Sequence, residues 1–566
     1  MTISDTSAIE SWIADDPDAT TASELRALLD AATGGDAAAE ADLADRFNGQ
    51  LTFGTAGLRG HLGGGPNRMN RAVVIRAAAG LVDVLKRRTG GDFTLVIGHD
   101  ARHGSHQFAL DTAAVAVAAG GRALVLPRAL PTPVAAFALR HLEADAAVVV
   151  TASHNPPEDN GYKVYLGGKV VTDSGQGTQI VPPFDSEIFE AIQKVPSVAS
   201  VPRAESGWEV LGEDLVEAYL DQVTSLVPSP APEGADALRI VLTSMHGVGG
   251  ETMLRALHMR GFHDVHVVAE QHEPDPEFPT VRFPNPEEPG ALDLSYALAR
   301  KVDADLILAN DPDADRCSAA VPDASSPTGW RQLTGDEVGS LLGEQTARLH
   351  EGDSSAVLAN SIVSSRQLAR IAAAHGVSHA YTLTGFKWIS RVPGLVFGYE
   401  EALGYCVDPE HVRDKDGISA CLRLAAFAAT CKAHGRTMTD ELDALALTHG
   451  LHATAPLTIR VEDLSIIATG MANLRANGIA SMAGSPVVES IDLASGSDSL
   501  PPTDGLLFRT EAGDQVVARP SGTEPKLKCY LEVIVPVEGG DVAAARRVAA
   551  ERLEAIKADV RTALGV

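Results

Sequence analysis

The sequence predicts an α/β protein of several domains, with a smaller α+β domain at the end. The chain has 566 residues, which is too long for a single hydrophobic core. After the first 48 residues, short apolar runs alternate with Ala- and Leu-rich helical patterns, as in parallel α/β layers. The last part of the chain instead places several strand-like runs between two helices, which is typical of an α+β domain with a largely antiparallel sheet. We therefore expect three α/β domains with mixed, largely parallel sheets, followed by one α+β domain.

Taken in order, the first 48 residues are Ala-rich and acidic and are expected to form a helical lead-in. Runs rich in Val, Leu, Ile and Ala predict strands at residues 93–98, 123–126, 146–150, 238–243, 265–268, 306–309, 356–359 and 395–398. Helical periodicity predicts helices at residues 107–119, 292–302, 338–349 and 367–374. In the last part, a helix at 464–476 precedes strands at 486–493, 505–509, 515–518 and 527–535, and a long helix begins near 541. The expected boundaries are 1–48 for the lead-in, 49–212, 213–325 and 326–450 for the α/β domains, and 451–566 for the α+β domain.

Composition excludes several classes of partner. The net charge is −29 and the pI is about 5.0, so the surface repels nucleic acids and anionic membranes. No apolar run reaches membrane-spanning length, and the acidic start of the chain lacks the apolar core of a signal peptide. The five cysteines are scattered without metal-ligand spacing, as in a protein with reduced thiols. We expect a soluble, cytoplasmic protein, a monomer or small homo-oligomer, whose partner is a small molecule.

Ser153 follows the apolar run 146–150 and stands in the sequence Thr-Ala-Ser-His-Asn-Pro. A buried strand that ends in polar residues presents those residues at a functional edge of the sheet. A serine that accepts a phosphoryl group needs a neighbouring base and positive charge, which His154 and Lys163 would supply. The alternative is a plain strand-to-loop turn with a capping serine.

Three aspartates, Asp311, Asp313 and Asp315, directly follow the predicted strand 306–309. Carboxylates at alternate positions of a tight loop can converge on one Mg²⁺ ion, and the carboxyl end of a strand is where α/β sheets bind ligands. An EF-hand is excluded, because Arg316 and Pro322 occupy the places of its Gly and Glu. A nucleophilic Asp of a haloacid-dehalogenase-type phosphatase and a solvated acidic turn remain as alternatives.

Two later loops have the composition of sugar and phosphate sites. Glu400 and Glu401 stand among glycines, and carboxylates accept hydrogen bonds from sugar hydroxyls. A second set combines an Arg with hydroxyl groups and a glycine, as in a phosphate cradle; it comprises Arg519, Ser521, Gly522 and Thr523. Charged surface loops and a hairpin turn are the alternatives. Other candidates near these loops are Thr384, Gly385, Lys415 and, in a glycine-rich loop near the start, Arg59.

Together and in this order, these motifs resemble the α-D-phosphohexomutase superfamily, which contains the phosphoglucomutases and phosphomannomutases. The resemblance extends from residue 54 to residue 528, and the forms of the Ser153 and Asp311 loops are most similar to the branch of phosphoglucomutase-2 and phosphopentomutase-like enzymes. It implies three topologically similar α/β domains and a fourth, TATA-binding-protein-like domain around a central cleft. Because water would hydrolyse a phosphoserine, we also expect a mobile fourth domain that closes over the substrate.

The resemblance also implies roles for the residues. Ser153 would be the phosphoserine and would bind Mg²⁺ together with Asp311, Asp313 and Asp315. The reacting phosphate would be surrounded by Arg59, His154, Lys163 and Arg316, with Lys415 assisting proton transfer. The sugar hydroxyls would be bound by Glu400 and Glu401 beside Thr384 and Gly385, and the phosphate that is not transferred by Arg519, Ser521, Gly522 and Thr523. The chain departs from many relatives at Ala402, where they have Ser, and at Tyr405.

The implied activity is the interconversion of hexose 1-phosphate and hexose 6-phosphate, with glucose or mannose as the sugar. The reaction would run through a 1,6-bisphosphate, and glucose 1,6-bisphosphate would be the activator. Three alternatives stay open. They are the same chemistry on pentose phosphates or as a sugar-bisphosphate synthase, a phosphatase, and a non-catalytic sugar-phosphate sensor.

Overall fold

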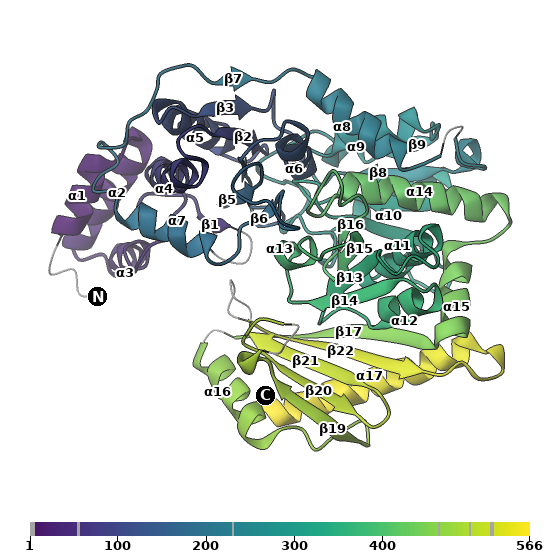
Figure 1. The fold of residues 1–566 in the computed structure, drawn as a ribbon. Helices are drawn as coiled ribbons and strands as arrows, with labels where there is room; N and C mark the ends of the chain where they lie inside the picture. Colours follow the sequence, from purple (N-terminus) through teal and green to yellow (C-terminus); the bar gives the residue numbers. More distant parts are fainter. Residues whose placement is uncertain are drawn as a thin grey trace. The chain divides into compact units, whose positions relative to one another are not determined.

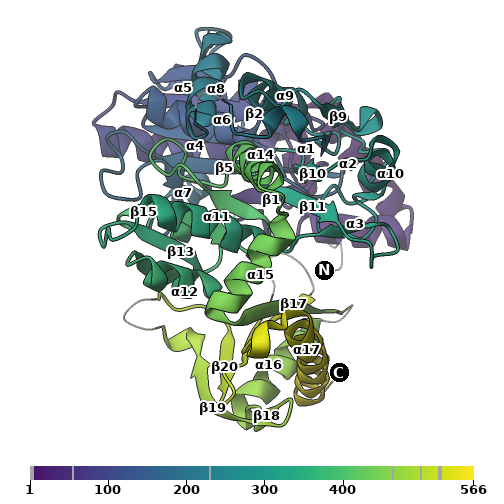
Figure 2. The same ribbon diagram turned by 90° about the vertical axis from the view of Figure 1, so that its right-hand side faces the viewer.

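The computed structural model describes residues 6–53, 57–228, 231–461, 464–496, 500–520 and 526–565. The chain forms two compact units, one made of Met1–Gln332 and Gly404–Thr430 and the other of Leu333–Leu403 and Cys431–Val566. Within the described ranges, no helix has both the length and the apolar character that a membrane crossing requires. Figure 1 and Figure 2 show the helices and strands of both units.

The lead-in consists of three helices, as the sequence predicts. They are α1 (Ser7–Asp15), α2 (Ala19–Thr33) and α3 (Ala37–Arg46). The Asp18 side chain accepts a hydrogen bond from the Thr20 N–H and caps α2, and Asp36 caps α3 in the same way. Their apolar faces meet in a small cluster of Ile9, Leu25, Leu29 and Leu43. The lead-in therefore has an apolar core of its own.

The first α/β layer is a seven-stranded mixed sheet in the order β1-β5-β4-β2-β3-β7, with β6 paired to β5. Its strands are β1 (Leu58–His61), β2 (Thr94–His99), β3 (Arg122–Val125), β4 (Ala146–Val150), β5 (Asp159–Leu166), β6 (Thr178–Gln179) and β7 (Glu209–Val210). Its helices are α4 (Arg71–Thr89), α5 (Ser105–Ala118), α6 (Thr132–His141) and α7 (Phe184–Gln193). Strands β4, β2, β3 and β7 are parallel, whereas β5 runs antiparallel to both β1 and β4.

The second layer is a five-stranded sheet in the order β12-β11-β10-β8-β9. Its strands are β8 (Ile240–Thr243), β9 (Val265–Val267), β10 (Leu306–Ala309), β11 (Ser318–Pro322) and β12 (Trp330–Gln332). Helical elements in this region are α8 (Asp214–Ser225), η1 (Ala235–Ala237), α9 (Gly250–Met259), η2 (Ala269–Gln271) and α10 (Asp293–Val302). Strand β16 (Gly404–Cys406) also belongs to the first unit, as does the start of α14 (Gly417–Ala433).

Gly247 packs against the loop that follows β10, and this contact leaves no room for a side chain. A Cβ atom at Gly247 would lie 2.3 Å from Pro312 Cα, and the neighbouring Val248 N–H donates to Pro312 O at 2.8 Å. We expect Gly247→Ala to displace this loop and to lower the free energy of unfolding by about 2 kcal/mol, because the clash is with backbone. Denaturant unfolding measures this effect. An unchanged unfolding midpoint would contradict it.

The third α/β layer lies in the second unit. Strand β13 (Val357–Ser361) runs parallel to β14 (Ser378–Thr382) on one side and to β15 (Leu395–Glu400) on the other. The helices are α11 (Gly335–Leu349), α12 (Gln367–Ala374), α13 (Phe386–Ile389) and α15 (Met438–His449). Capping boxes begin two of them, Thr334 with Glu337 at α11 and Thr437 with Asp440 at α15.

The fourth domain is an antiparallel sheet in the order β17-β22-β21-β20-β19-β18. Its strands are β17 (Leu451–Arg460), β18 (Ser481–Met482), β19 (Ser485–Asp492), β20 (Leu506–Thr510), β21 (Gln515–Pro520) and β22 (Lys526–Val535). Its helical elements are α16 (Leu464–Asn477), η3 (Leu493–Ser495), η4 (Glu538–Gly540) and α17 (Val542–Leu564). Helix α17 packs along the sheet beside β17 and β22, as Figure 1 and Figure 2 show. Three α/β layers and one α+β domain are thus present, and the predicted fold class is confirmed.

Candidate active site

Ser153 lies in a tight loop directly after β4. Its φ is 52°, in the left-handed region that non-glycine residues rarely adopt, and the residue is only 2% exposed. Its N–H donates to Thr151 Oγ1 at 2.9 Å. Its hydroxyl lies 3.2 Å from His154 Nδ1 and donates to Asp311 Oδ2 at 2.8 Å. The Ser153 hydroxyl therefore meets the aspartate loop of the second layer.

Arg102 holds the Ser153 loop in this conformation. Its guanidinium donates to four backbone carbonyls of the loop, those of Ser153 (2.6 Å), Asn155, Pro156 (2.7 Å) and Asp159 (3.1 Å). The side chain is buried, its Nε lies 3.3 Å from Asp100 Oδ2, and its guanidinium carbon lies 4.9 Å from the centre of the Phe278 ring. Such a set of contacts stabilises the strained backbone at Ser153.

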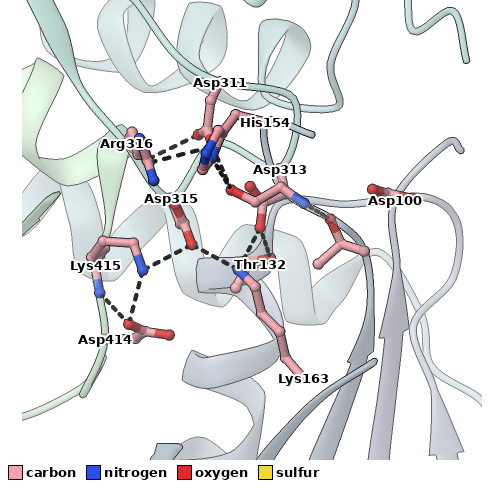
Figure 3. Close-up of polar contacts among 12 residues, drawn as sticks. Asp100, Thr132, His154, Lys163, Asp311, Asp313, Asp315, Arg316, Asp414 and Lys415 are labelled. Atoms are coloured by element: carbon pink, nitrogen blue, oxygen red, sulfur yellow. Dashed lines mark hydrogen bonds and ion pairs between the residues drawn. The ribbon is translucent and has the colours of Figure 1, made fainter. Parts of the chain in front are cut away.

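The three aspartates converge at the carboxyl end of β10. One oxygen from each of Asp311, Asp313 and Asp315 lies within 4.8 Å of the others, and all three residues are buried. Figure 3 shows the cluster together with two cationic side chains, Lys163 and Lys415. Lys163 Nζ donates to Asp313 Oδ2 and to Asp315 Oδ2, both at 2.7 Å, and Lys415 Nζ lies 3.1 Å from Asp315 Oδ2.

The electrostatics of this cluster favour a bound cation. Burial, together with the charges of Asp313 and Asp315, raises the pKa of Asp311 to about 8. Burial also favours the neutral form of Asp315, but Lys163 and Lys415 outweigh it and hold the pKa of Asp315 below its usual range. A divalent cation would offset the remaining repulsion among the three carboxylates.

The free oxygens of the cluster fit a metal ion. Oδ1 of Asp313 and Oδ1 of Asp315 are buried and accept no hydrogen bond from any described residue. The Oδ2 atom of Asp313 is already engaged, by Lys163 and by the Thr132 hydroxyl at 2.6 Å. Buried oxygens without donors are costly unless a cation satisfies them, and oxygen ligands of this kind suit Mg²⁺. The residues present therefore fit the metal that the sequence suggests.

Two arginines and a neutral histidine complete the surroundings of Ser153. The Arg316 N–H donates to Asp311 Oδ1 at 3.0 Å, and its Nε lies 3.9 Å from Asp311 Oδ2. Arg59, on β1, donates to Asn155 Oδ1 at 3.5 Å. Burial, with the charges of Arg316 and Arg59, lowers the pKa of His154 well below its ordinary value. The His154 imidazole is therefore neutral at pH 7.

Lys415 is held by a chain of buried polar groups. Its Nζ lies 3.5 Å from Asp414 Oδ1. Asp414 Oδ2 accepts hydrogen bonds from the Tyr165 hydroxyl at 2.6 Å and from Gln179 Nε2 at 2.8 Å. The Lys415 ammonium is thus placed between Asp414 and Asp315.

The remaining predicted residues lie in the second unit. Glu400 ends β15, and Glu401 follows it; Glu401 Oε2 accepts hydrogen bonds from Ser361 Oγ at 3.1 Å and Ser364 Oγ at 2.8 Å. Arg519, near the end of β21, donates through Nη1 to the Thr384 hydroxyl, next to Gly385. Three predicted phosphate-loop residues, Ser521, Gly522 and Thr523, lie outside the described residues.

Within the first unit, the structure brings most of the predicted residues together at one place. Within the second unit, the predicted residues lie at two separate places. The first set comprises Ser153, His154, Lys163, Arg59, Arg316, Lys415 and the three aspartates. The second set, in the other unit, comprises Thr384 and Arg519 at one place and Glu401 with its two serines at another. Two residues that no sequence pattern indicated also contact the first set. Arg102 donates to the Ser153 carbonyl, and the Thr132 hydroxyl donates to Asp313 Oδ2.

Comparisons with known proteins identify the family. Three family models match in order, Phosphoglucomutase/phosphomannomutase alpha/beta/alpha domain I at residues 50–198, domain II at 217–324 and domain III at 334–447. A probable phosphomannomutase from Haemophilus influenzae is 45% identical over 493 residues, covering 86% of this chain and 97% of that protein. A phosphopentomutase from Homo sapiens is 32% identical over 565 residues, covering 90% and 89%.

A solved structure shares the fold. It is a putative phosphomannomutase from Thermus thermophilus, with a TM-score of 0.66 and 24% identity, covering 89% of this chain and 99% of that one. Fold, site and relatives together define an intramolecular phosphotransferase that acts on sugar phosphates. The chain belongs to the phosphoglucomutase/phosphomannomutase family, within the α-D-phosphohexomutase superfamily.

We expect Arg102→Lys to lower kcat roughly 100-fold without changing the Mg²⁺ concentration that half-activates the enzyme. Lysine keeps the charge but lacks the planar guanidinium that donates to four carbonyls. The Ser153 loop therefore loses its conformation, whereas the three aspartates keep their positions. Arg122→Lys is the matched control, because Arg122 makes an exposed ion pair with Glu209. A kcat within threefold or so of that control would contradict the role assigned to Arg102.

Proposed function

We propose that the enzyme interconverts hexose 1-phosphate and hexose 6-phosphate, with glucose as the hexose and mannose as the second candidate. The observation that carries the proposal is the 2.8 Å hydrogen bond from Ser153 Oγ to Asp311 Oδ2. This bond supports the proposal that the hydroxyl of Ser153, as the nucleophile, and the three aspartates, as the metal ligands, share one buried site.

In the proposed reaction, phosphorylated Ser153 transfers its phosphoryl group to the free hydroxyl of the sugar phosphate. The P–O bond to Ser153 Oγ breaks as the bond to the sugar oxygen forms, and the proton of the sugar hydroxyl passes to a basic group of the protein. The resulting bisphosphate reorients, and its other phosphate returns to Ser153 by the reverse step. Glucose 1,6-bisphosphate would serve as the activator that restores phosphoserine.

The chain's own residues supply positive charge and position. Lys163, Arg59, His154 and Arg316 surround the reacting phosphate. The positive charges of Lys163, Arg59 and Arg316 stabilise the negative charge that spreads over the phosphoryl group during transfer, and the neutral His154 contributes a hydrogen bond. Lys415, placed by Asp414 and Asp315, assists proton transfer. Asp311, Asp313 and Asp315 would hold Mg²⁺, which supplies further charge stabilisation when bound.

Substrate recognition is assigned to the second unit. Glu400 accepts hydrogen bonds from the sugar hydroxyls, and Glu401, whose Oε2 already binds two serines, orients the loop. The phosphate that is not transferred is bound by Arg519 together with Ser521, Gly522 and Thr523. The five cysteines are free and buried, which supports our proposal of a cytoplasmic enzyme.

Pentose phosphates are the alternative to hexose phosphates as substrates. The similarity to a human phosphopentomutase favours them, and so does Ala402, because it removes a hydroxyl from the predicted sugar loop. Initial rates on glucose, mannose, ribose and deoxyribose 1-phosphates, each with a trace of glucose 1,6-bisphosphate, decide between the two. We expect the highest kcat/KM on glucose 1-phosphate. A tenfold or so preference for a pentose would replace the hexose proposal, and steady release of inorganic phosphate would indicate a phosphatase.

A further inference from the structure

Thr132 belongs to the first α/β layer but donates to an aspartate of the second layer. It is the first residue of α6 and is fully buried. Its hydroxyl donates to Asp313 Oδ2 at 2.6 Å, and its N–H donates to the Asp313 carbonyl at 2.9 Å. Figure 3 shows Thr132 beside the aspartate cluster. Thr132 therefore holds both the backbone and the carboxylate of Asp313.

The Thr132 hydroxyl serves Asp313 rather than its own helix. A hydroxyl at the start of a helix commonly accepts a hydrogen bond from an N–H of the first turn. Helix α6 begins without a side-chain cap, and the Thr132 hydroxyl points to Asp313 instead. Pro131 and Pro133 restrain the backbone on either side, and a β-branched side chain has few rotamers. The position of the hydroxyl is therefore well determined.

Thr132 and Lys163 together occupy one oxygen of Asp313. A carboxylate oxygen has two lone pairs, so two donors saturate it. Oδ2 of Asp313 accepts hydrogen bonds from the Thr132 hydroxyl at 2.6 Å and from Lys163 Nζ at 2.7 Å. Oδ1 is buried and accepts none from the residues that the structure describes. Asp313 therefore offers a cation one oxygen, not two.

Asp315 has the same division of its oxygens. Its Oδ2 accepts a hydrogen bond from Lys163 Nζ at 2.7 Å and lies 3.1 Å from Lys415 Nζ. Its Oδ1 is buried and, over the described ranges, has no donor. The protein thus closes one oxygen of Asp313 and one of Asp315 to a bound cation.

This arrangement favours a small cation over a large one. Mg²⁺ binds in near-octahedral geometry and keeps several waters, so single oxygens from the carboxylates satisfy it. Ca²⁺ takes more oxygen ligands in a flexible geometry and commonly binds a carboxylate through both oxygens. That second mode of binding is closed at Asp313 as long as Oδ2 has both of its donors.

We propose that Thr132 determines the specificity of the metal site, because it keeps Oδ2 of Asp313 occupied and so favours Mg²⁺ over Ca²⁺. Thr132 acts through Asp313 and is therefore a positioning residue. Lys163 alone does not suffice, since one donor leaves a lone pair of Oδ2 open. The proposal rests on the proposed function for the assignment of the three aspartates as metal ligands.

Binding of Mg²⁺ alone and of Ca²⁺ alone to the full chain tests the proposal without turnover. Thr132→Val replaces the hydroxyl by a methyl group, whereas Thr132→Ser keeps the hydroxyl. Isothermal titration calorimetry gives both dissociation constants, with the phosphorylation state of Ser153 matched by intact mass. We expect Thr132→Val to lower the ratio of the Ca²⁺ to the Mg²⁺ dissociation constant at least about fivefold, and Thr132→Ser to leave it within about twofold.

Thr224→Val is the matched control. The Thr224 hydroxyl is buried in the same unit, and it donates to the Asp221 carbonyl of its own helix, α8. Its removal is expected to leave the ratio unchanged. A ratio in Thr132→Val equal to that of the control would overturn the proposal, and so would an equal fall in Thr132→Ser.

Two further measurements keep the proposal testable if Thr132→Val does not fold. Thr132→Ala removes the same hydroxyl, and the same fall in the ratio is expected. The unsubstituted protein is expected to bind Mg²⁺ at least about tenfold more tightly than Ca²⁺, and equal affinities would overturn the proposal.

The outcome is independent of the proposed mutase reaction, because neither titration contains a sugar. A shifted ratio in a protein without mutase activity would support the role of Thr132 and remove the proposed function. An unshifted ratio in an active mutase would do the reverse.

Discussion

Replacing Ser153 by alanine is expected to lower mutase kcat by at least about 10⁴-fold. The hydroxyl is the atom that carries the phosphoryl group in the proposed reaction, and neither Asp311 nor His154, its two neighbours, can replace it as an alcohol acceptor. The side chain is small and the alanine removes only one oxygen, so the fold is expected to persist. A coupled assay for hexose 6-phosphate measures the loss.

Ser186→Ala is the control for this substitution, because Ser186 is exposed on α7. It removes the same oxygen and is expected to leave kcat unchanged. Turnover in Ser153→Ala above a tenth or so of the control would remove Ser153 as the carrier.

Replacing Asp313 by asparagine is expected to lower kcat/KM by about 10³-fold and to raise the half-activating Mg²⁺ concentration at least 100-fold or so. The substitution removes one charge from the triad and leaves one side-chain oxygen where the carboxylate has two, of which Oδ1 has no donor among the described residues. It also places an amide beside Lys163 and Thr132, which both donate to the native carboxylate. Activity measured across a Mg²⁺ titration after treatment with a chelator shows both effects.

The matched control is Asp303→Asn. Asp303 is exposed and has a φ of 54°, a conformation that asparagine also tolerates. An Mg²⁺ dependence of Asp313→Asn equal to that of this control would exclude the triad as the metal site.

Much of the fold could be predicted, because the interior strands have a simple pattern. Strands β4 and β10 are short runs of Ala, Val, Leu and Ile with a polar loop at the carboxyl end, and both were predicted with their observed bounds. Strand β5 was not predicted, since four of the eight residues of Asp159–Leu166 are Asp, Asn, Gly and Lys, although every residue is buried. Lys163 is buried because it pairs with Asp313 and Asp315, which lie far away in the sequence, and periodicity does not reveal such a contact.

The site was predictable wherever the reactive groups are consecutive in sequence. The spacing of Asp311, Asp313 and Asp315 in a loop after a strand was enough to predict that their carboxylates converge. Arg102 was missed because its partners are backbone carbonyls 51 to 57 residues further along, which leave no motif. The signal that could have indicated it is the polar sequence Asp100-Ala101-Arg102 directly after β2, at the same edge of the sheet as Ser153.

Phosphopeptide mapping determines whether Ser153 carries the phosphoryl group during turnover. The unmodified enzyme is incubated with glucose 1,6-bisphosphate and Mg²⁺, mapped by mass spectrometry, and then chased with hexose 1-phosphate. We expect one phosphoryl group on Ser153, which leaves on the chase and appears in the sugar bisphosphate. A phosphoryl group on another residue, or one on Ser153 that the sugar does not remove, would contradict it.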